Sequence, residues 1–422
     1  MASPKISKLL AEAKAKGPDD QEAALDHLLV NIQSFSSPSS LSADINALAD
    51  AIFANGLRIV AQAKLIERLS LVLKHFARTD LTVPVAEHTL ALLASQQQSA
   101  TFLAQEASLR DLLAGAHEAN EDFLEATKVL AAVNLDSAQR NVTNEERVEI
   151  WVRIVRDYLE VDDTTSAETY LNKLKNVIYT VSDTALNLHF SLSQARIQDA
   201  KHEFLAASQA YHNLSFSTVI TDEERLRSLG PAARCAILAP AGPLRSRALG
   251  RLYKDERVVT LDEFPMLENM FLDRLITPAE VDKFAQRLAD HQKATTSDGS
   301  TVLAKAVVEH NLLAASRLYS NISFDALAGL LGLDAERAED TTAKMIEQGR
   351  LVGRIDQIEQ VIWFERGEAS GEKGSGRAEV TVGREMRRWD ANVQGLAEEV
   401  ENVTNALQRE FPDFVAANLA AV

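Results

Sequence analysis

The nine histidines are the side chains with the most obvious potential for metal or acid–base chemistry. They are His27, His75, His88, His117, His189, His202, His212, His291 and His310. Two of them, His117 and His202, are each followed by a glutamate, as in the H-E-x-x-H motif of zinc proteases. The second histidine of that motif is absent, because the residues four positions on are Glu121 and Ala206. The sequence therefore predicts no metal site and no cofactor.

The patterns for nucleophilic catalysis and phosphate binding are incomplete too. Cys235 lies in the apolar run RCAIL, which predicts a buried structural thiol and not a catalytic one. Gly371, Gly374 and Gly376 follow no predicted strand, so we interpret them as linker residues and not as a phosphate-binding loop. The sequence contains no Walker A motif and no G-x-S-x-G motif. We expect that the chain is not an enzyme.

Basic side chains gather at two places where an anion could bind. The first cluster is Arg245, Arg247, Arg251 and Lys254, and the second is Arg384, Arg387 and Arg388. The whole chain carries 44 basic and 61 acidic residues and a net charge of −17, which disfavours contact with a nucleic-acid backbone. We interpret both clusters as solvent-exposed faces that form ion pairs with other subunits.

The composition predicts a mostly helical fold with more than one domain. The 422 residues include only 17 glycines and 10 prolines, whereas an average chain of this length has about 50 of the two together. The single cysteine excludes an intrachain disulfide and fits a reducing compartment. No apolar run is long enough to cross a membrane, and no apolar segment is typical of a signal peptide. We therefore expect no membrane contact and a cytoplasmic and nuclear location.

A helical repeat is visible within residues 1–295. Five alanines recur at nearly equal intervals: Ala86, Ala126, Ala167, Ala207 and Ala248. Each is followed four positions later by a large side chain: Leu90, Leu130, Leu171, Tyr211 and Leu252. A period of about 40 residues predicts one helix pair per repeat, in a solenoid of the TPR or HEAT type. Breaks between helices are expected near residues 34–42, 78–84, 95–99, 134–144, 161–166 and 230–243.

Residues 296–366 are predicted to form a winged-helix domain. Ser297, Asp298 and Ser300 are candidate caps of a first helix. Ser323 is the expected N-cap of a second helix, which should end near Gly332. A third helix is expected to end at Gly349, and two short apolar runs after it predict a β-hairpin. Three helices followed by a hairpin are typical of a winged helix.

The third helix of this domain would contact DNA in a transcription factor. It carries four carboxylates, at Glu336, Glu339, Asp340 and Glu347, which phosphates would repel. The pattern therefore favours a protein-interaction module, and its hairpin would offer a free strand edge to a similar domain.

The C-terminal region has two predicted parts. Residues 367–388 are rich in glycine and charge, which predicts a flexible insertion. Residues 389–422 are predicted to be a helix with an apolar seam, because its large residues recur at intervals of 4, 3, 4, 3 and 4. The seam is Trp389, Val393, Leu396, Val400, Val403 and Leu407. Either helices of other chains or the chain's own helices must cover it.

Helical repeats, a winged helix and a terminal helix in this order resemble the PCI-domain family. That family supplies subunits to the proteasome lid, the COP9 signalosome and a translation initiation factor. The segments similar to signalosome members are LYKDERV (252–258), MLENMFLDRLI (266–276), HQKATTSDGSTVLAKAVVEHNLLAASRLYSNISF (291–324) and MIEQGRLVGRIDQIEQVIWFE (345–365). The similarity spans about residues 145–365, whereas residues 366–388 depart from the animal forms.

This resemblance implies a non-catalytic scaffold. The signalosome removes the ubiquitin-like modifier Nedd from cullin–RING ubiquitin ligases, using a JAMM zinc isopeptidase that is a different subunit. The resemblance implies that the N-terminal arm reaches the cullin–RING ligase and that the winged helix joins other PCI subunits. It also implies that the terminal helix enters a bundle shared with other subunits, the JAMM/MPN subunits among them. The predicted PCI–PCI interface is Leu351, Val352, Val361, Ile362 and Trp363.

Two alternatives stay open on the sequence alone. The chain could be a PCI subunit of the proteasome lid, which would share the same architecture. It could also be a winged-helix protein that binds nucleic acid, although its acidic third helix disfavours that function.

Overall fold

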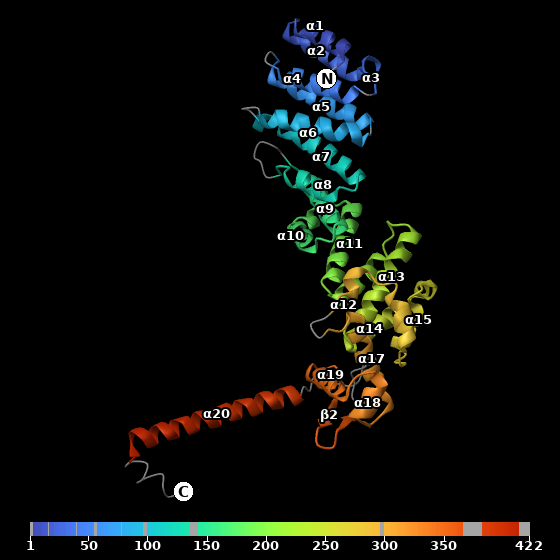
Figure 1. Cartoon of the computed structure of the whole chain (residues 1–422), viewed down its shortest axis with the longest axis vertical. Coiled ribbons are helices and arrows are strands. Elements are labelled where there is room, and N and C mark those ends of the chain that lie inside the picture. The colour runs from blue at the N-terminus through green and yellow to red at the C-terminus, as the bar shows by residue number, and fades with distance from the viewer. Residues whose placement is uncertain are drawn as a thin grey trace. The chain divides into compact units, whose positions relative to one another are not determined.

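The structure is a computed structural model that describes residues 3–15, 17–38, 40–54, 57–76, 78–95, 99–135, 142–295, 299–365 and 382–412. The chain divides into two units, Met1–Ile197 and Gln198–Val422. Both units are built mainly from helices, and the small sheet lies near the label β2 in Figure 1. The expected fold class, a helical repeat array followed by a winged helix and a terminal helix, is confirmed. Among the described helices, none has both the length and the hydrophobicity needed to cross a lipid bilayer.

The first unit contains α1 (Pro4–Lys14), α2 (Pro18–Val30), α3 (Ile32–Phe35), α4 (Leu41–Phe53), α5 (Ile59–Phe76), α6 (Thr79–Ser95), η1 (Ser99–Phe102), α7 (Leu103–Ala119), α8 (Phe123–Ala131), α9 (Asn144–Glu160), α10 (Thr164–Lys175), η2 (Ile178–Thr180) and most of α11 (Thr184–Ala200). The second contains α12 (Phe204–Leu214), α13 (Asp222–Leu238), α14 (Pro243–Tyr253), η3 (Glu256–Thr260), α15 (Phe264–Phe271), α16 (Pro278–Ala285), η4 (Asp290–Lys293), α17 (Val302–Leu318), β1 (Asn321–Ser323), α18 (Phe324–Leu331), α19 (Ala335–Glu347), β2 (Gly353–Asp356), β3 (Val361–Phe364) and α20 (Val382–Glu410).

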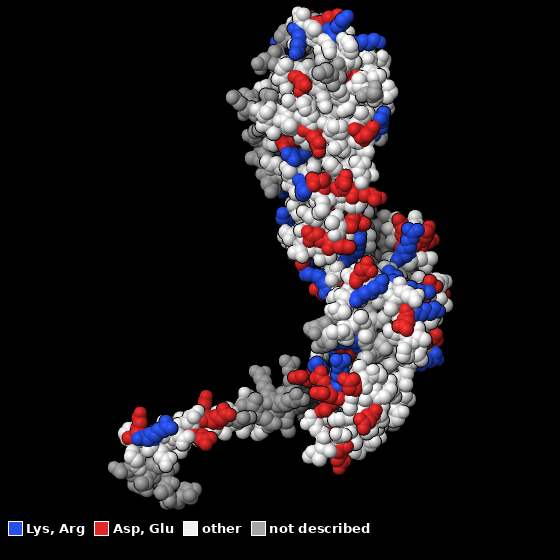
Figure 2. Space-filling model, in the orientation of Figure 1, with Lys and Arg blue, Asp and Glu red and all other residues white. Residues whose placement is uncertain are grey.

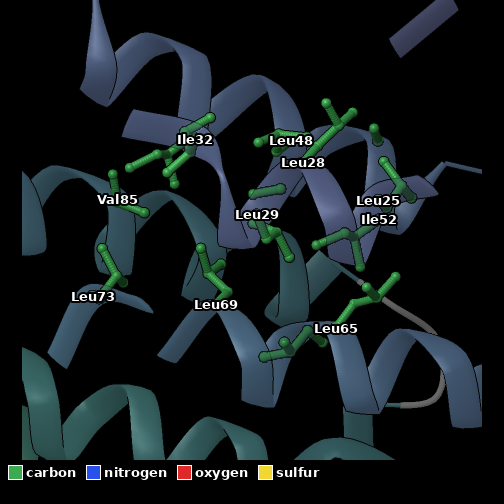
Figure 3. Packing of buried hydrophobic residues seen from close by; sticks show 14 of the residues in the cluster. Leu25, Leu28, Leu29, Ile32, Leu48, Ile52, Leu65, Leu69, Leu73 and Val85 are labelled. Carbon is green, nitrogen blue, oxygen red and sulfur yellow. The ribbon is translucent and has the colours of Figure 1, made fainter. Parts of the chain in front are cut away.

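The N-terminal helices share one apolar core. Leucines and isoleucines at one-turn spacing on α2, α4 and α5 point toward one another in Figure 3. Leu29, Leu48 and Leu69 are fully buried there, and Leu25 and Leu65 are 1% exposed. Burying a side chain of this size stabilises the folded state by roughly 1.5–3 kcal/mol. These helices form because their apolar residues recur at helical spacing and meet on one side.

The alanine repeat marks every second helix. Its alanines lie on α6, α8, α10, α12 and α14, and the first four of them are completely buried. Ala248, the last, is half-buried. A buried alanine at the same place in each pair lets the neighbouring helix approach closely. The spacing in the sequence therefore corresponds to one helix pair per repeat, as predicted.

The same turn joins α7 to α8, α9 to α10 and α11 to α12. Glu121, Asp162 and His202 have φ angles of 64°, 61° and 62°, in the left-handed region that favours glycine. After each, a backbone N–H closes the turn by donating to a carbonyl near the end of the preceding helix. These hydrogen bonds run from Asp122 to His117 (2.9 Å), from Asp163 to Tyr158 (3.0 Å) and from Glu203 to Gln198 (2.8 Å). The sequence does not show this turn because no glycine marks it.

Two expected helix breaks are shorter in the structure than the sequence predicts. The sequence predicts a break at residues 78–84, yet α6 begins at Thr79 and includes Pro84. Likewise, α13 continues through Gly230 and Pro231 to Leu238. In α13, Thr221 and Glu224 form a reciprocal capping box, and most residues after Leu229 are buried. Tertiary packing therefore outweighs the one backbone hydrogen bond that proline removes.

The terminal helix begins earlier than expected. α20 starts at Val382, so residues 382–388 of the predicted flexible insertion are helical. Glycine is sparse there, whereas arginine, glutamate and methionine are strong helix formers, which explains the earlier start. α20 ends at Glu410, just before Pro412. The remainder of the insertion, 367–381, and residues 413–422 lie outside the described residues.

A buried carboxylate lies between α7 and α9. Asp157 is completely buried, and neither of its carboxylate oxygens accepts a hydrogen bond. Glu118 accepts hydrogen bonds from both nearby guanidiniums, with Arg153 Nε at 3.0 Å and Arg156 Nη2 at 3.0 Å, whereas Arg156 Nη2 lies 3.6 Å from Asp157 Oδ1. Burial, and then the charge of Glu118, raise the pKa of Asp157 to about 7. The folded chain therefore holds this proton over a pH range in which the unfolded chain has lost it.

Asp157→Asn is expected to stabilise the first unit at pH 8 and to leave its stability at pH 4 almost unchanged. Since the folded pKa lies above the usual 3.8, this group lowers stability as pH rises from about 4 to about 7. The gain at pH 8 should be about 2–4 kcal/mol. Urea unfolding of the full chain at both pH values measures it. Asp111→Asn, at a carboxylate that is 54% exposed, is the control and should not stabilise. An equal effect of Asp157→Asn at both pH values would contradict the assignment.

Candidate functional site

Two of the residues considered for catalysis, Cys235 and His291, lie near the carboxylate of Asp199, whose Oδ2 is 3.3 Å from His291 Nε2. Cys235 is completely buried, as predicted, and burial followed by the charge of Asp199 raises the pKa of its thiol. Gln292 Nε2 donates to both carboxylate oxygens of Asp199, at 2.9 Å each. These hydrogen bonds join Asp199 at the end of α11 to η4. No group of three or more potential metal ligands occurs in the part of the chain that is described. The candidate sites are therefore surfaces.

The structure separates the members of the first basic cluster. Arg245 is 3% exposed and donates to the carbonyls of Ala239 and Ala306, so it belongs to the interior. Arg247, Arg251 and Lys254 are exposed. The prediction of one solvent-exposed face is therefore wrong for Arg245, because the proline-started helix α14 turns this residue toward α17. Arg384, Arg387 and Arg388 lie on α20, and their side chains are outside the described part.

The winged helix of the second unit has three strands where the sequence predicted two. β1 and β2 pair antiparallel with opposite edges of β3, in the order β1-β3-β2. The three residues of β1 were expected only to precede a helix cap, and Ser323 does cap α18. Thr301 caps α17, whereas the expected candidates were Ser297, Asp298 and Ser300, of which the first two lie outside the described residues. Since β3 is paired on both sides, its backbone is closed to a further strand, and the free edge nearest the wing belongs to β2.

The predicted interface residues fall into two groups, those in the core of the winged helix and those on the outward face of its sheet. Leu351 and Ile362 are 4% and 0% exposed and pack in the domain's own core. Val361 and Trp363 alternate with core residues along β3 and point away from it. Trp363 is 36% exposed, and the guanidinium of Arg354 lies 5.3 Å from its ring centroid. Val352, directly before β2, is half-buried.

The outward sheet face and the edge of β2 form one candidate interaction site. On β2, Gly353 lies so close to β3 that a Cβ there would be 2.6 Å from the Trp363 carbonyl oxygen. Glycine at this position therefore keeps β2 on the sheet. Figure 2 shows acidic side chains gathered around the nearby α19, whose sequence includes the four predicted carboxylates. A face of this charge suits a protein better than a nucleic acid.

The seam of α20 is a second candidate site. Trp389, Leu396, Val400 and Val403 are 58–64% exposed, and Val393 is 44% exposed. Leu407 is half-buried. The described residues of the chain therefore leave most of this apolar stripe uncovered. An exposed stripe at heptad spacing is the surface that a coiled coil or helical bundle buries.

A buried polar joint holds the winged helix to the preceding helices, and sequence reasoning missed it. Arg350 donates to both carboxylate oxygens of Glu309, with Nη2 2.8 Å from Oε1. It also donates to the Ala241 carbonyl at 3.1 Å, while the Ala241 N–H donates to Glu309 at 3.1 Å. A glutamate inside the apolar α17 segment AVVEHNLL was the available sign of such a joint.

The neighbouring His310 extends this joint as a neutral residue. One ring nitrogen lies 2.8 Å from the Arg274 carbonyl and the other 3.3 Å from Arg245. Burial, and then the positive charge of Arg245, lower the pKa of His310 to about 4. The ring is therefore neutral near pH 7, donating to Arg274 and accepting from Arg245.

The family models match the two halves of this architecture. The model described as PSMD12/CSN4, N-terminal, matches residues 5–223, and the PCI domain model matches residues 285–366. The chain is similar to COP9 signalosome complex subunit 4 of Neurospora crassa, with 53% identity that covers 99% of each chain. It is also similar to the subunit 4 proteins of Emericella nidulans (46% identity, 96% of this chain and 97% of that one) and Arabidopsis thaliana (33%, 96% and 98%).

The chain belongs to the family of COP9 signalosome subunit 4 proteins.

The comparisons confirm the resemblance found in residues 252–324 and 345–365. They extend it to residues 1–140, where the sequence had shown only helical character. The PCI match ends at residue 366, directly after β3, so the seam of α20 lies beyond that domain.

Proposed function

We propose that this chain is a non-catalytic scaffold subunit of a COP9 signalosome, working in the cytoplasm and the nucleus. The observation that carries the proposal is full-length similarity, at 53% identity, to a protein named as subunit 4 of that complex. The complex would remove the modifier Nedd from cullin–RING ligases through a separate JAMM zinc isopeptidase subunit. This chain would supply binding surfaces and no catalytic group, since the resemblance implies a scaffold.

The two candidate surfaces support different contacts in this proposal. The outward sheet face and the β2 edge would bind another PCI subunit, with Val352, Val361 and Trp363 in the interface. Leu351 and Ile362 would support that face from the core, a change from their predicted role. The α20 seam would enter a bundle with helices of other subunits, the JAMM/MPN subunits included. The helical arm of the first unit would contact the cullin–RING ligase.

Affinity purification of the full chain from its own cells, followed by mass identification, tests this function. We expect other PCI subunits and a JAMM subunit to be recovered with it. Recovery of proteasome lid subunits instead would contradict the proposal and assign the chain to the lid. The purified chain alone, with or without zinc, should leave a Nedd–cullin conjugate intact, and cleavage by the chain alone would contradict the non-catalytic role.

A further inference from the structure

A small groove lies between α12 and α14 in the second unit, away from the sheet and the α20 seam. Its volume is about 180 Å³. Apolar and polar side chains both line it: Leu205, Ala206, Ser208, Gln209, His212, Leu244, Ala248, Arg251 and Leu252. Leu244, at the first turn of α14, is 61% exposed. The groove therefore combines an uncovered apolar wall with a small set of polar atoms.

The positive charge of this groove is uncompensated. Arg251 is exposed and forms no ion pair with any residue that the structure describes. Arg247, one turn earlier on α14, and Lys254, directly after the end of α14, are also exposed and form no ion pair with a described residue. Arg257, in contrast, is bound by Asp255 at 2.7 Å. Three free cations in and directly after one helix are unusual in a chain with a net charge of −17, and they attract an anion.

The wall opposite Arg251 contributes no negative charge. The α12 residues that line the groove are Leu205, Ala206, Ser208, Gln209 and His212, and none of them is acidic. His212 Nε2 makes no hydrogen bond, although Asp255 Oδ2 lies 3.5 Å away. Burial lowers the pKa of His212, and Asp255 offsets this only in part, so the ring is neutral near pH 7. One guanidinium flanked by neutral donors is complementary to a single carboxylate.

We propose that this groove binds an acidic, leucine-bearing segment of a partner protein. One carboxylate of the segment would pair with Arg251, and an apolar side chain next to it would pack on Leu244 and Ala248. A nucleic acid fits less well, because its phosphates need a longer row of cations and would leave the apolar walls uncovered. This inference does not depend on the proposed scaffold function, since it concerns the isolated chain.

A peptide library tests the proposal even though the partner is unidentified. Phage that display short random peptides would be selected on the immobilised full chain, and an enriched peptide would be labelled for fluorescence anisotropy. We expect enriched peptides to carry Asp or Glu next to Leu, Ile or Met. Replacing that acid by its amide should weaken binding about tenfold or more. No enrichment, or enrichment of peptides without an acid, would overturn the proposal.

Three variants in and beside α14 separate the groove from the general positive charge of this segment. Arg251→Ala should weaken the selected peptide about tenfold or more, whereas Lys254→Ala, which removes the same charge outside the groove, should change it less than about twofold. Leu244→Asp should also abolish binding. Circular dichroism confirms folding of each exposed-site variant. Equal losses for Arg251→Ala and Lys254→Ala, or displacement of the peptide by duplex DNA, would overturn the proposal.

Discussion

Replacing Leu396 and Val403 together by aspartate is expected to release the chain from its complex without unfolding it. Both side chains are mostly exposed in the described structure, at 62% and 60%. The substitutions should therefore change the folding stability of the isolated chain very little. In a helical bundle, the same two positions would lie in the apolar seam. Each aspartate would then bring an unpaired charge into that interface, and affinity should fall at least about a hundredfold.

Co-purification of the tagged variant from cells measures this effect, and thermal unfolding of the isolated variant checks the fold. The double variant Asn402→Asp with Asn405→Asp is the matched control. It adds the same two negative charges to α20 at exposed positions outside the seam. We expect the control to recover its partners normally. If the seam variant also recovers them, α20 does not belong to an intermolecular bundle.

Patterns that repeat along the chain were the part of the fold that sequence reasoning could predict. The evenly spaced alanines do lie on alternate helices, because each repeat packs its helix pair against its neighbours in the same way. The heptad seam of α20 was predicted for a similar reason, although the helix starts at Val382 and not at Trp389. In both cases the periodicity of large and small residues is itself the cause of the structure.

Features set by contacts between distant residues could not be predicted. β1 has only three residues and forms because Ile322 pairs with Ile362, which lies far along the chain. The alternation along β3 likewise could not show that Ile362 faces the core and Trp363 faces outward, since either face satisfies period two. The buried pair of Glu309 and Arg350 joins residues 41 positions apart. Nothing local to either residue identifies its partner.

That buried pair is the basis of the second large effect. Glu309→Ala is expected to destabilise the second unit by about 3–5 kcal/mol. The Glu309 side chain is 4% exposed and that of Arg350 16%, so removing the carboxylate leaves a guanidinium with little access to water. It also leaves the Ala241 N–H without its acceptor. The cost comes from these two unpaired groups more than from the lost attraction.

Urea unfolding of the full chain at pH 7 measures the loss, and the exposed pair of Arg227 and Glu223 provides the control. Glu223→Ala breaks an ion pair whose side chains are 76% and 77% exposed, so it should cost less than about 0.5 kcal/mol. Burial raises the pKa of Glu309, but Arg350 more than offsets this and the net pKa is lowered. The stabilisation from Glu309 is thus present above its usual pKa of 4.5 and declines as pH falls below it. Equal effects of the two substitutions at pH 7 would show that the joint does not hold the winged helix in place.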